Sequence, residues 1–173
     1  MVSENEALRL RRLVFYTADI DRINAALLTF VRKSGATSAL LIDQEGHLVA
    51  RQGFSEAKSK DGSAMAALVA GSFASTREVA KLLGESEFRT LFHQGPHQSI
   101  SVILIGERTL QVAVFPSAVK PGMVQVLGKE LANQLEVILA EAAKRPPDAT
   151  QPQLGSGFSD AMKDQLDNLF GNL

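Results

Sequence analysis

A short apolar run, Ser38-Ala39-Leu40-Leu41-Ile42, constrains the fold more than any other feature of this sequence. A strand with one face in water alternates between apolar and polar residues, whereas a run of consecutive apolar residues predicts a strand that is covered on both faces. Gln44-Glu45-Gly46 can form a turn after this run, and residues 47–51 are then expected to return as the neighbouring strand. We therefore expect a sheet with helices packed on both sides.

The rest of the chain supplies those helices and three further strands. Apolar residues recur at helical spacing in three segments, which we expect to form helices at 18–33, 63–83 and 123–143. Three shorter segments end at glycine or proline and predict strands at 88–93, 100–105 and 110–115. The element order α-β-β-α-β-β-β-α predicts an α+β fold on one five-stranded antiparallel sheet. A short apolar run at 13–16 could add an edge strand.

Composition divides the chain into a folded domain and its flanking segments. We expect a polar N-terminal extension at 1–12, one domain at 13–144, and a linker rich in proline and glycine at 145–157. Beyond the linker, residues 158–173 regain helical spacing, with an apolar side formed by Met162, Leu166, Leu169 and Phe170. A helix this short is unstable alone. It either docks on its own domain or is held ready for a partner's groove.

Charge and residue usage exclude several functional classes. The 173 residues carry a net charge of −1 and no cysteine, which argues against nucleic-acid binding, disulfide scaffolds and cysteine metal sites. The N-terminus does not resemble a signal peptide, and no apolar run is long enough to span a bilayer. We expect a cytoplasmic protein that does not insert into membranes.

The sequence contains no convincing catalytic constellation. His93 and His97 are four residues apart, but Gly95-Pro96 between them prevents a shared helical face. No phosphate-binding glycine pattern or nucleophile elbow occurs, and the arginines show no pattern that singles out a transition-state finger. We expect no enzymatic activity, metal or cofactor. A small-molecule sensor or hydrolase that uses both histidines and Asp43 is the weakest alternative.

The helix expected at 63–83 carries an unusual second face. Its sheet-facing side is expected to comprise Met65, Leu68, Val69, Phe73, Val79 and Leu83. The other side consists mainly of small residues, namely Ala67, Ala70, Gly71, Ala74 and Ser75, with Glu78 at its end. Exposed helix faces usually carry Glu, Lys and Arg, and a glycine within a helix costs about 0.5–1 kcal/mol relative to alanine. Small residues allow another backbone to approach, which predicts an interface, although tight burial in its own domain would explain them too.

Several segments together resemble one protein family, the MglB proteins of bacterial polarity systems, which have the Roadblock fold. The resemblance covers nearly the whole chain. It rests on Leu13–Tyr16, Leu41-Ile42-Asp43 with Gly46, Ala66–Gly71, Val79–Phe88, Phe92-His93-Gln94-Gly95, Val114-Phe115 and the tail residues Asp167–Phe170.

This resemblance implies a function. MglB-like proteins are homodimers that bind one Ras-like GTPase of the MglA type and stimulate its GTP hydrolysis, in systems that control polarity and motility. They reshape the switch region of the GTPase without supplying an arginine finger. The implied contacts are Ala67, Ala70, Gly71, Ala74, Ser75 and Glu78, with the tail helix docking elsewhere on the GTPase. Glu78 departs from the small residue usual there. The implied location is the cytoplasm, concentrated at a cell pole.

Two further expectations follow. The strand at 88–93 lies at a sheet edge in this fold, and unpaired edges favour association, so we expect it to pair with a second copy across a two-fold axis. The alternative function is that of a Roadblock scaffold or adaptor, which binds a GTPase without changing its turnover.

Overall fold

The computed structural model describes residues 15–53 and 61–144. The expected extension at 1–12, the linker at 145–157 and the tail at 158–173, with its docking residues Met162, Leu166, Leu169 and Phe170, lie outside the described residues. Of the run at 13–16, only Phe15 and Tyr16 are described, and both are buried.

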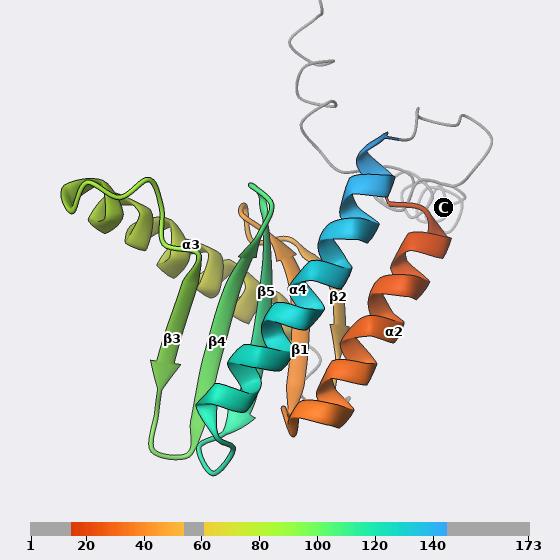
Figure 1. Ribbon diagram of the computed structural model, residues 1–173, viewed down its shortest axis with the longest axis horizontal. Coiled ribbons are helices and arrows are strands. Elements are labelled where there is room, and N and C mark those ends of the chain that lie inside the picture. The colour runs from red at the N-terminus through yellow and green to blue at the C-terminus, as the bar shows by residue number, and fades with distance from the viewer. Residues whose placement is uncertain (1–14, 54–60, 145–173) are drawn as a thin grey trace, which may run out of the picture.

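One antiparallel sheet of five strands has the order β2-β1-β5-β4-β3 (Figure 1). Three helices, α2 (Thr17–Ser34), α3 (Asp61–Leu82) and α4 (Pro121–Lys144), flank it. The strands are β1 (Ser38–Asp43), β2 (Leu48–Gln52), β3 (Thr90–Gln94), β4 (Gln98–Ile105) and β5 (Thr109–Pro116). The predicted element order and α+β architecture are confirmed. Predicted and observed bounds differ by at most two residues.

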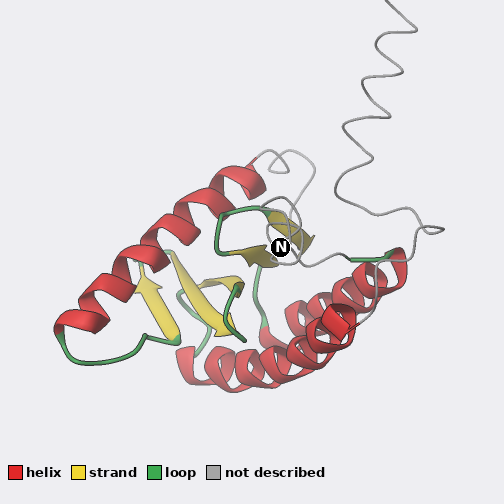
Figure 2. Cartoon of the chain, turned by 90° about the horizontal axis from the view of Figure 1, so that it is seen from above, coloured by secondary structure: helices red, strands yellow, loops and turns green. Residues whose placement is uncertain are grey.

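The helices form two layers, one on each face of the sheet (Figure 2). α2 and α4 lie together on one face, and α3 lies on the other. Successive residues of β1 point into different cores: Leu41 packs with α2 and α4, whereas Leu40 and Ile42 pack with α3. All three side chains are fully buried. The prediction that this run is covered on both faces is therefore confirmed.

Local signals place the first helix. Asp19 lies in the first turn of α2, where its Oδ2 accepts a hydrogen bond of 3.2 Å from the Tyr16 N–H. This contact satisfies a backbone donor at the helix start. The helix ends at Gly35, whose φ of 72° is the left-handed conformation that glycine adopts without a steric penalty.

The β1–β2 turn lies directly against α3. Gly46 in this turn has a φ of 89°, and a Cβ atom there would lie 2.8 Å from the Ala67 Cα. Asp43 braces the same turn, because its Oδ1 accepts a 2.7 Å hydrogen bond from the His47 N–H. The turn therefore needs a glycine for two reasons, backbone conformation and close packing.

This packing gives a first testable prediction. Gly46→Ala should lower the free energy of unfolding by at least about 1–3 kcal/mol, because it adds both left-handed strain and a clash with α3. The matched control is Gly106→Ala, where φ is 57° and no described atom lies within 4 Å of the added Cβ. Urea denaturation of both variants measures the difference. Equal losses would show that the approach to Ala67 adds nothing.

Candidate partner-binding surface

The buried side of α3 is narrow and made mostly of small residues. Ala66, Ala70 and Ala80 are each at most 4% exposed, and Phe73 is the one large side chain among the fully buried residues of this helix. Ala66, Ala70 and Phe73 pack on the apolar side chains of β1, β4 and β5. Alanine at the contact allows the helix axis to lie close to the sheet.

This packing corrects two parts of the sequence prediction. Leu68, Val79 and Leu83 were expected to face the sheet, but they are 75%, 49% and 69% exposed. Ala70 was expected on the partner-binding face, but it is 4% exposed because it packs on the sheet. Met65, Val69 and Phe73 do contact the core between α3 and the sheet, as predicted.

The remaining small residues stay on the outer surface. Ala67, Gly71, Ala74, Ser75 and Glu78 are all exposed, and their spacing places them on adjoining parts of the outer surface of α3. We call Ala67, Gly71, Ala74 and Ser75 the small-residue ridge, with Glu78 at its C-terminal end. Ala67 has a reason to be small within the monomer, because the β1–β2 turn lies against it.

Gly71 is the residue that packing within the chain does not explain. A Cβ added there would meet no described heavy atom within 4 Å. Alanine would fit the site and would favour the helix, so the described part of the chain gains nothing from a glycine here. The Gly71 carbonyl accepts a 3.0 Å hydrogen bond from the Ser75 hydroxyl. The Ser75 side chain is thereby turned toward the helix backbone, and its hydroxyl is paired.

The charged end of the ridge is weakly held. Glu78 accepts a 2.7 Å contact from the Lys81 Nζ, and the two side chains are 70% and 59% exposed. An exposed ion pair one helical turn long contributes only about 0.3–0.5 kcal/mol, so these side chains can rearrange when another molecule approaches.

A second exposed region lies beside the ridge and is strongly apolar. It comprises Leu68, Val79 and Leu82 of α3 and Leu83 directly after it, and we call it the apolar side of α3. Leu82 is 87% exposed, the highest value among the large exposed hydrophobic residues of the described chain. The C-terminal end of α3 extends past β3 in both views (Figures 1 and 2). This apolar side therefore continues toward an edge of the sheet.

The backbone of β3 offers hydrogen-bonding groups along that edge. The Arg89 carbonyl accepts a 2.9 Å hydrogen bond from the Leu104 N–H, and the Gly95 N–H donates one of 3.0 Å to the Gln98 carbonyl. In an antiparallel ladder, alternate residues bond to the same neighbour, so Thr90, Phe92 and Gln94 direct their backbone groups away from β4. No other described strand pairs with this edge. The predicted edge position is thus confirmed, although the strand begins two residues later than expected.

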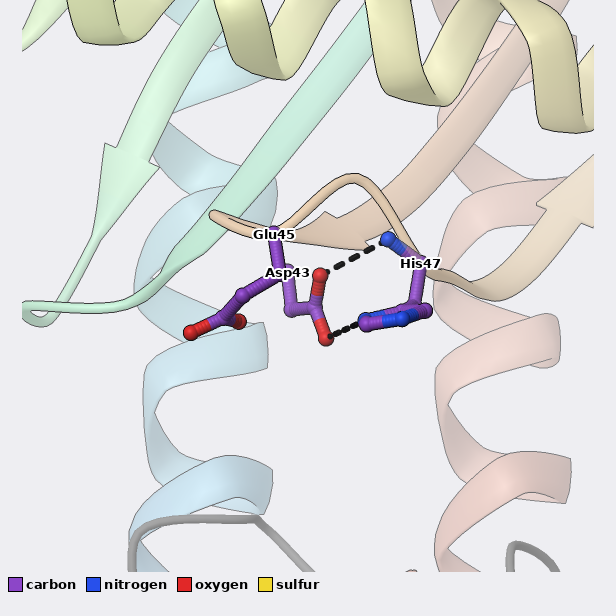
Figure 3. Close-up of side chains that lie close together, drawn as sticks. All are labelled: Asp43, Glu45 and His47. Atoms are coloured by element: carbon purple, nitrogen blue, oxygen red, sulfur yellow. Dashed lines mark hydrogen bonds and ion pairs between the residues drawn. The ribbon is translucent and has the colours of Figure 1, made fainter.

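The three side chains of the β1–β2 turn lie close together. Ligand atoms of Asp43, Glu45 and His47 lie within 4.8 Å of one another (Figure 3). The His47 Nδ1 is 2.7 Å from the Asp43 Oδ2, and Glu45 forms a 3.0 Å ion pair with Arg108. Each carboxylate therefore already has a partner that stabilises the turn, and we interpret the cluster as structural. His93 and His97 belong to the β3–β4 hairpin, whereas Asp43 is the last residue of β1. The alternative site predicted from these three residues would therefore combine two separate hairpins.

None of the described helices combines the length and apolar character needed to cross a bilayer.

Among the described residues, the outer surface of α3 and the β3 edge beside it are the region that we consider as a candidate binding surface.

The free space around Gly71 among the described residues gives a second prediction. Gly71→Ala should raise the free energy of unfolding by about 0.5–1 kcal/mol, because the methyl group meets no described atom and favours the helix. The matched control is Gly128→Ala in α4, where the added Cβ would lie 3.0 Å from the Ile103 Cδ1 and should give a smaller gain or a loss. Urea denaturation measures both. Destabilisation by Gly71→Ala would show that another chain already contacts the ridge in the isolated protein.

Several known proteins share this fold. The Roadblock/LC7 domain family matches residues 22–115. Among solved structures, Myxococcus xanthus MglB is 29% identical with a TM-score of 0.70, covering 78% of this chain and 100% of that one. The gliding protein MglB from Thermus thermophilus is 38% identical with a TM-score of 0.69, covering 75% and 96%. A structure described as MglB with tetrameric arrangement is 37% identical with a TM-score of 0.70 and the same coverage. No curated protein sequence gave a significant match.

Proposed function

Because this chain belongs to the Roadblock/LC7 domain family and is MglB-like, we propose that it is a homodimeric regulator that binds a Ras-like GTPase of the MglA type and stimulates its GTP hydrolysis. The observation that carries the proposal is Gly71, a glycine in the middle of an exposed helix face with no described neighbour within 4 Å. A residue that weakens its own helix and contacts none of the described residues of its own domain is accounted for by the approach of another molecule.

The proposed contact is the small-residue ridge with Glu78. Its side chains are too short to keep a partner's backbone at a distance, so a switch loop can lie against the helix itself. Stimulation would come from holding the switch loops in a hydrolysis-competent conformation, which shifts a population that already exists in the GTPase. None of the proposed contacts is an arginine, and the proposal requires no catalytic group from this chain. The tail residues Met162, Leu166, Leu169 and Phe170 are proposed to bind the same GTPase at a separate place.

The second part of the proposal is the dimer. Across a two-fold axis, β3 would pair with the β3 of a second copy and make one continuous sheet. Both α3 helices would then lie on the same face of that sheet. Their apolar sides, which extend past β3, would become buried against each other. This arrangement would cover the leucines and the valine that are exposed in the single chain.

The activator proposal predicts faster hydrolysis. GTP turnover by an MglA-type GTPase should rise when this protein is added at saturating concentration. Phosphate release in single-turnover experiments measures the effect. Binding without any change in turnover would instead identify a scaffold or adaptor, and the activator claim would be wrong.

A substitution on the ridge tests the contact surface. Ala74→Arg should weaken GTPase binding at least tenfold, about 1.4 kcal/mol, because the long charged side chain keeps the partner's backbone away from α3. Ala25→Arg is the matched control, since Ala25 is also an exposed helical alanine but belongs to α2 on the opposite face of the sheet. Titration calorimetry measures both affinities, and circular dichroism checks that both variants are folded. Equal affinities for the two variants would exclude the ridge as the contact.

A substitution on the sheet edge tests the dimer. Thr90→Pro removes an N–H that points away from β4 while keeping the bonds between β3 and β4, so the mass in solution should shift from dimer toward monomer. Thr90→Ala loses the same side chain but keeps the N–H, and it should remain a dimer. Light scattering after size-exclusion chromatography measures the masses. The same mass for both variants would place any self-association elsewhere.

A further inference from the structure

The outer surface of α4 carries apolar side chains that neither the proposed GTPase contact nor the proposed dimer uses. Met123, Val126 and Val137 are 47%, 68% and 56% exposed. Their spacing places all three on one side of the helix, within about 60° of each other at 100° per residue. Exposed helix positions favour Glu, Lys and Arg over valine, so a row of this kind indicates a surface that something covers.

A groove adjoins this row. It runs between α2 and α4 and is lined by Ala26, Thr29 and Lys33 from α2 and by Leu127, Glu130 and Gln134 from α4. Together with the apolar row it forms what we call the α2–α4 face, on the opposite side of the sheet from α3 (Figure 2). A short amphipathic helix is the kind of segment that fits an apolar row beside a groove.

We propose that residues 158–170 of this same chain dock as a helix on the α2–α4 face of their own protomer. This inference concerns the isolated protein and does not depend on any GTPase. The segment continues from the C-terminal end of α4, which already lies on this side of the sheet and is tied to α2 by a 2.6 Å ion pair between Arg22 and Glu141. The surface of α3 lies behind the sheet from there.

The dimensions agree. The connecting residues 145–157 can span at most about 45 Å when extended, and α4 is about 36 Å long, so the segment can reach every part of the face. Val126 and Val137 are eleven residues apart, about 17 Å along a helix. Phe158 and Leu169 are also eleven residues apart, so a helical segment would offer apolar contacts at the same separation.

Charge favours the same occupant. The segment 158–170 holds three aspartates, Asp160, Asp164 and Asp167, against one lysine. The last turn of α2 is basic, with Arg32 and Lys33. The groove itself carries one charge of each sign, Lys33 and Glu130, so the basic end of α2 is the part of the face that attracts the acidic segment. A tether of this length gives an effective concentration in the millimolar range, so docking with an affinity of only about 1 mM already occupies the face for a large part of the time. Docking thereby supplies the tertiary contacts that a helix of this length needs to form.

Because the chain contains no cysteine, one introduced cysteine is the single attachment point for a spin label, and no native cysteine has to be replaced. Asn168→Cys carries the label on a polar position of the segment, in the full-length protein. Isotopically labelled chains with the spin label are mixed with an excess of unlabelled wild-type chains, so that each detected chain senses mainly its own label. NMR should then show strong broadening of the amides of Thr29, Lys33, Val126 and Val137, and little broadening along α3.

Two controls make the outcome decisive. Val126→Asp should abolish most of this broadening, whereas Gln125→Asp, an exposed neighbour on the other side of α4, should preserve it. In the reverse mixture, isotopically labelled wild-type chains are combined with unlabelled spin-labelled chains and should show no broadening of the face. Broadening confined to that mixture would mean that the segment reaches a second copy. Broadening of α3, or none at all, would likewise overturn the proposal.

Discussion

Burial of the central strands on both faces is the constraint from which the rest of the structure follows. β1 and β5 have no face left for water, since Leu40, Leu41 and Ile42 are fully buried and every residue of β5 before its terminal proline is buried. A sheet of this kind requires a helical layer on each side. Two helices cover one face, but only α3 covers the other. The outward surface of this single covering helix carries the small-residue ridge, and β3 beside it is an edge strand with no second partner among the described strands.

The sequence was sufficient to predict the architecture because its strongest signals are local. Doubly buried strands, turn glycines and helical spacing each depend on a few neighbouring residues, and they located every described helix and strand to within two residues. The orientation of α3 was harder to predict. Large apolar residues were assigned to the sheet and small ones to the surface, yet Leu68 lies outside and Ala70 lies inside. The physical reason is that the separation of α3 from the sheet, which no local pattern records, decides the side-chain size at the contact.

The same reason explains why only part of the site could be predicted. A helix lying close to a sheet needs alanines on its inner side, and a helix that receives a partner's backbone needs small residues on its outer side. Composition alone cannot separate these two demands when both occur on one helix. The structure separates them for the described residues: Ala66 and Ala70 pack on the sheet, Ala67 accommodates the β1–β2 turn, and Gly71 does neither.

The arrangement of the two exposed regions on α3 bears on how many GTPases the proposed dimer can bind. The apolar side extends past β3, so pairing of β3 with its symmetry mate would place both α3 helices next to each other, with their ridges on one common surface. A GTPase has no two-fold symmetry, and its switch region cannot make the same contacts with two ridges at once. A partner that lies over both helices would therefore use one ridge through one set of contacts and the other ridge through a different set, and it would block a second GTPase from either. In the proposed dimer, two identical ridges would thus form one binding site, which agrees with the single GTPase per homodimer that the resemblance to MglB-like proteins implies.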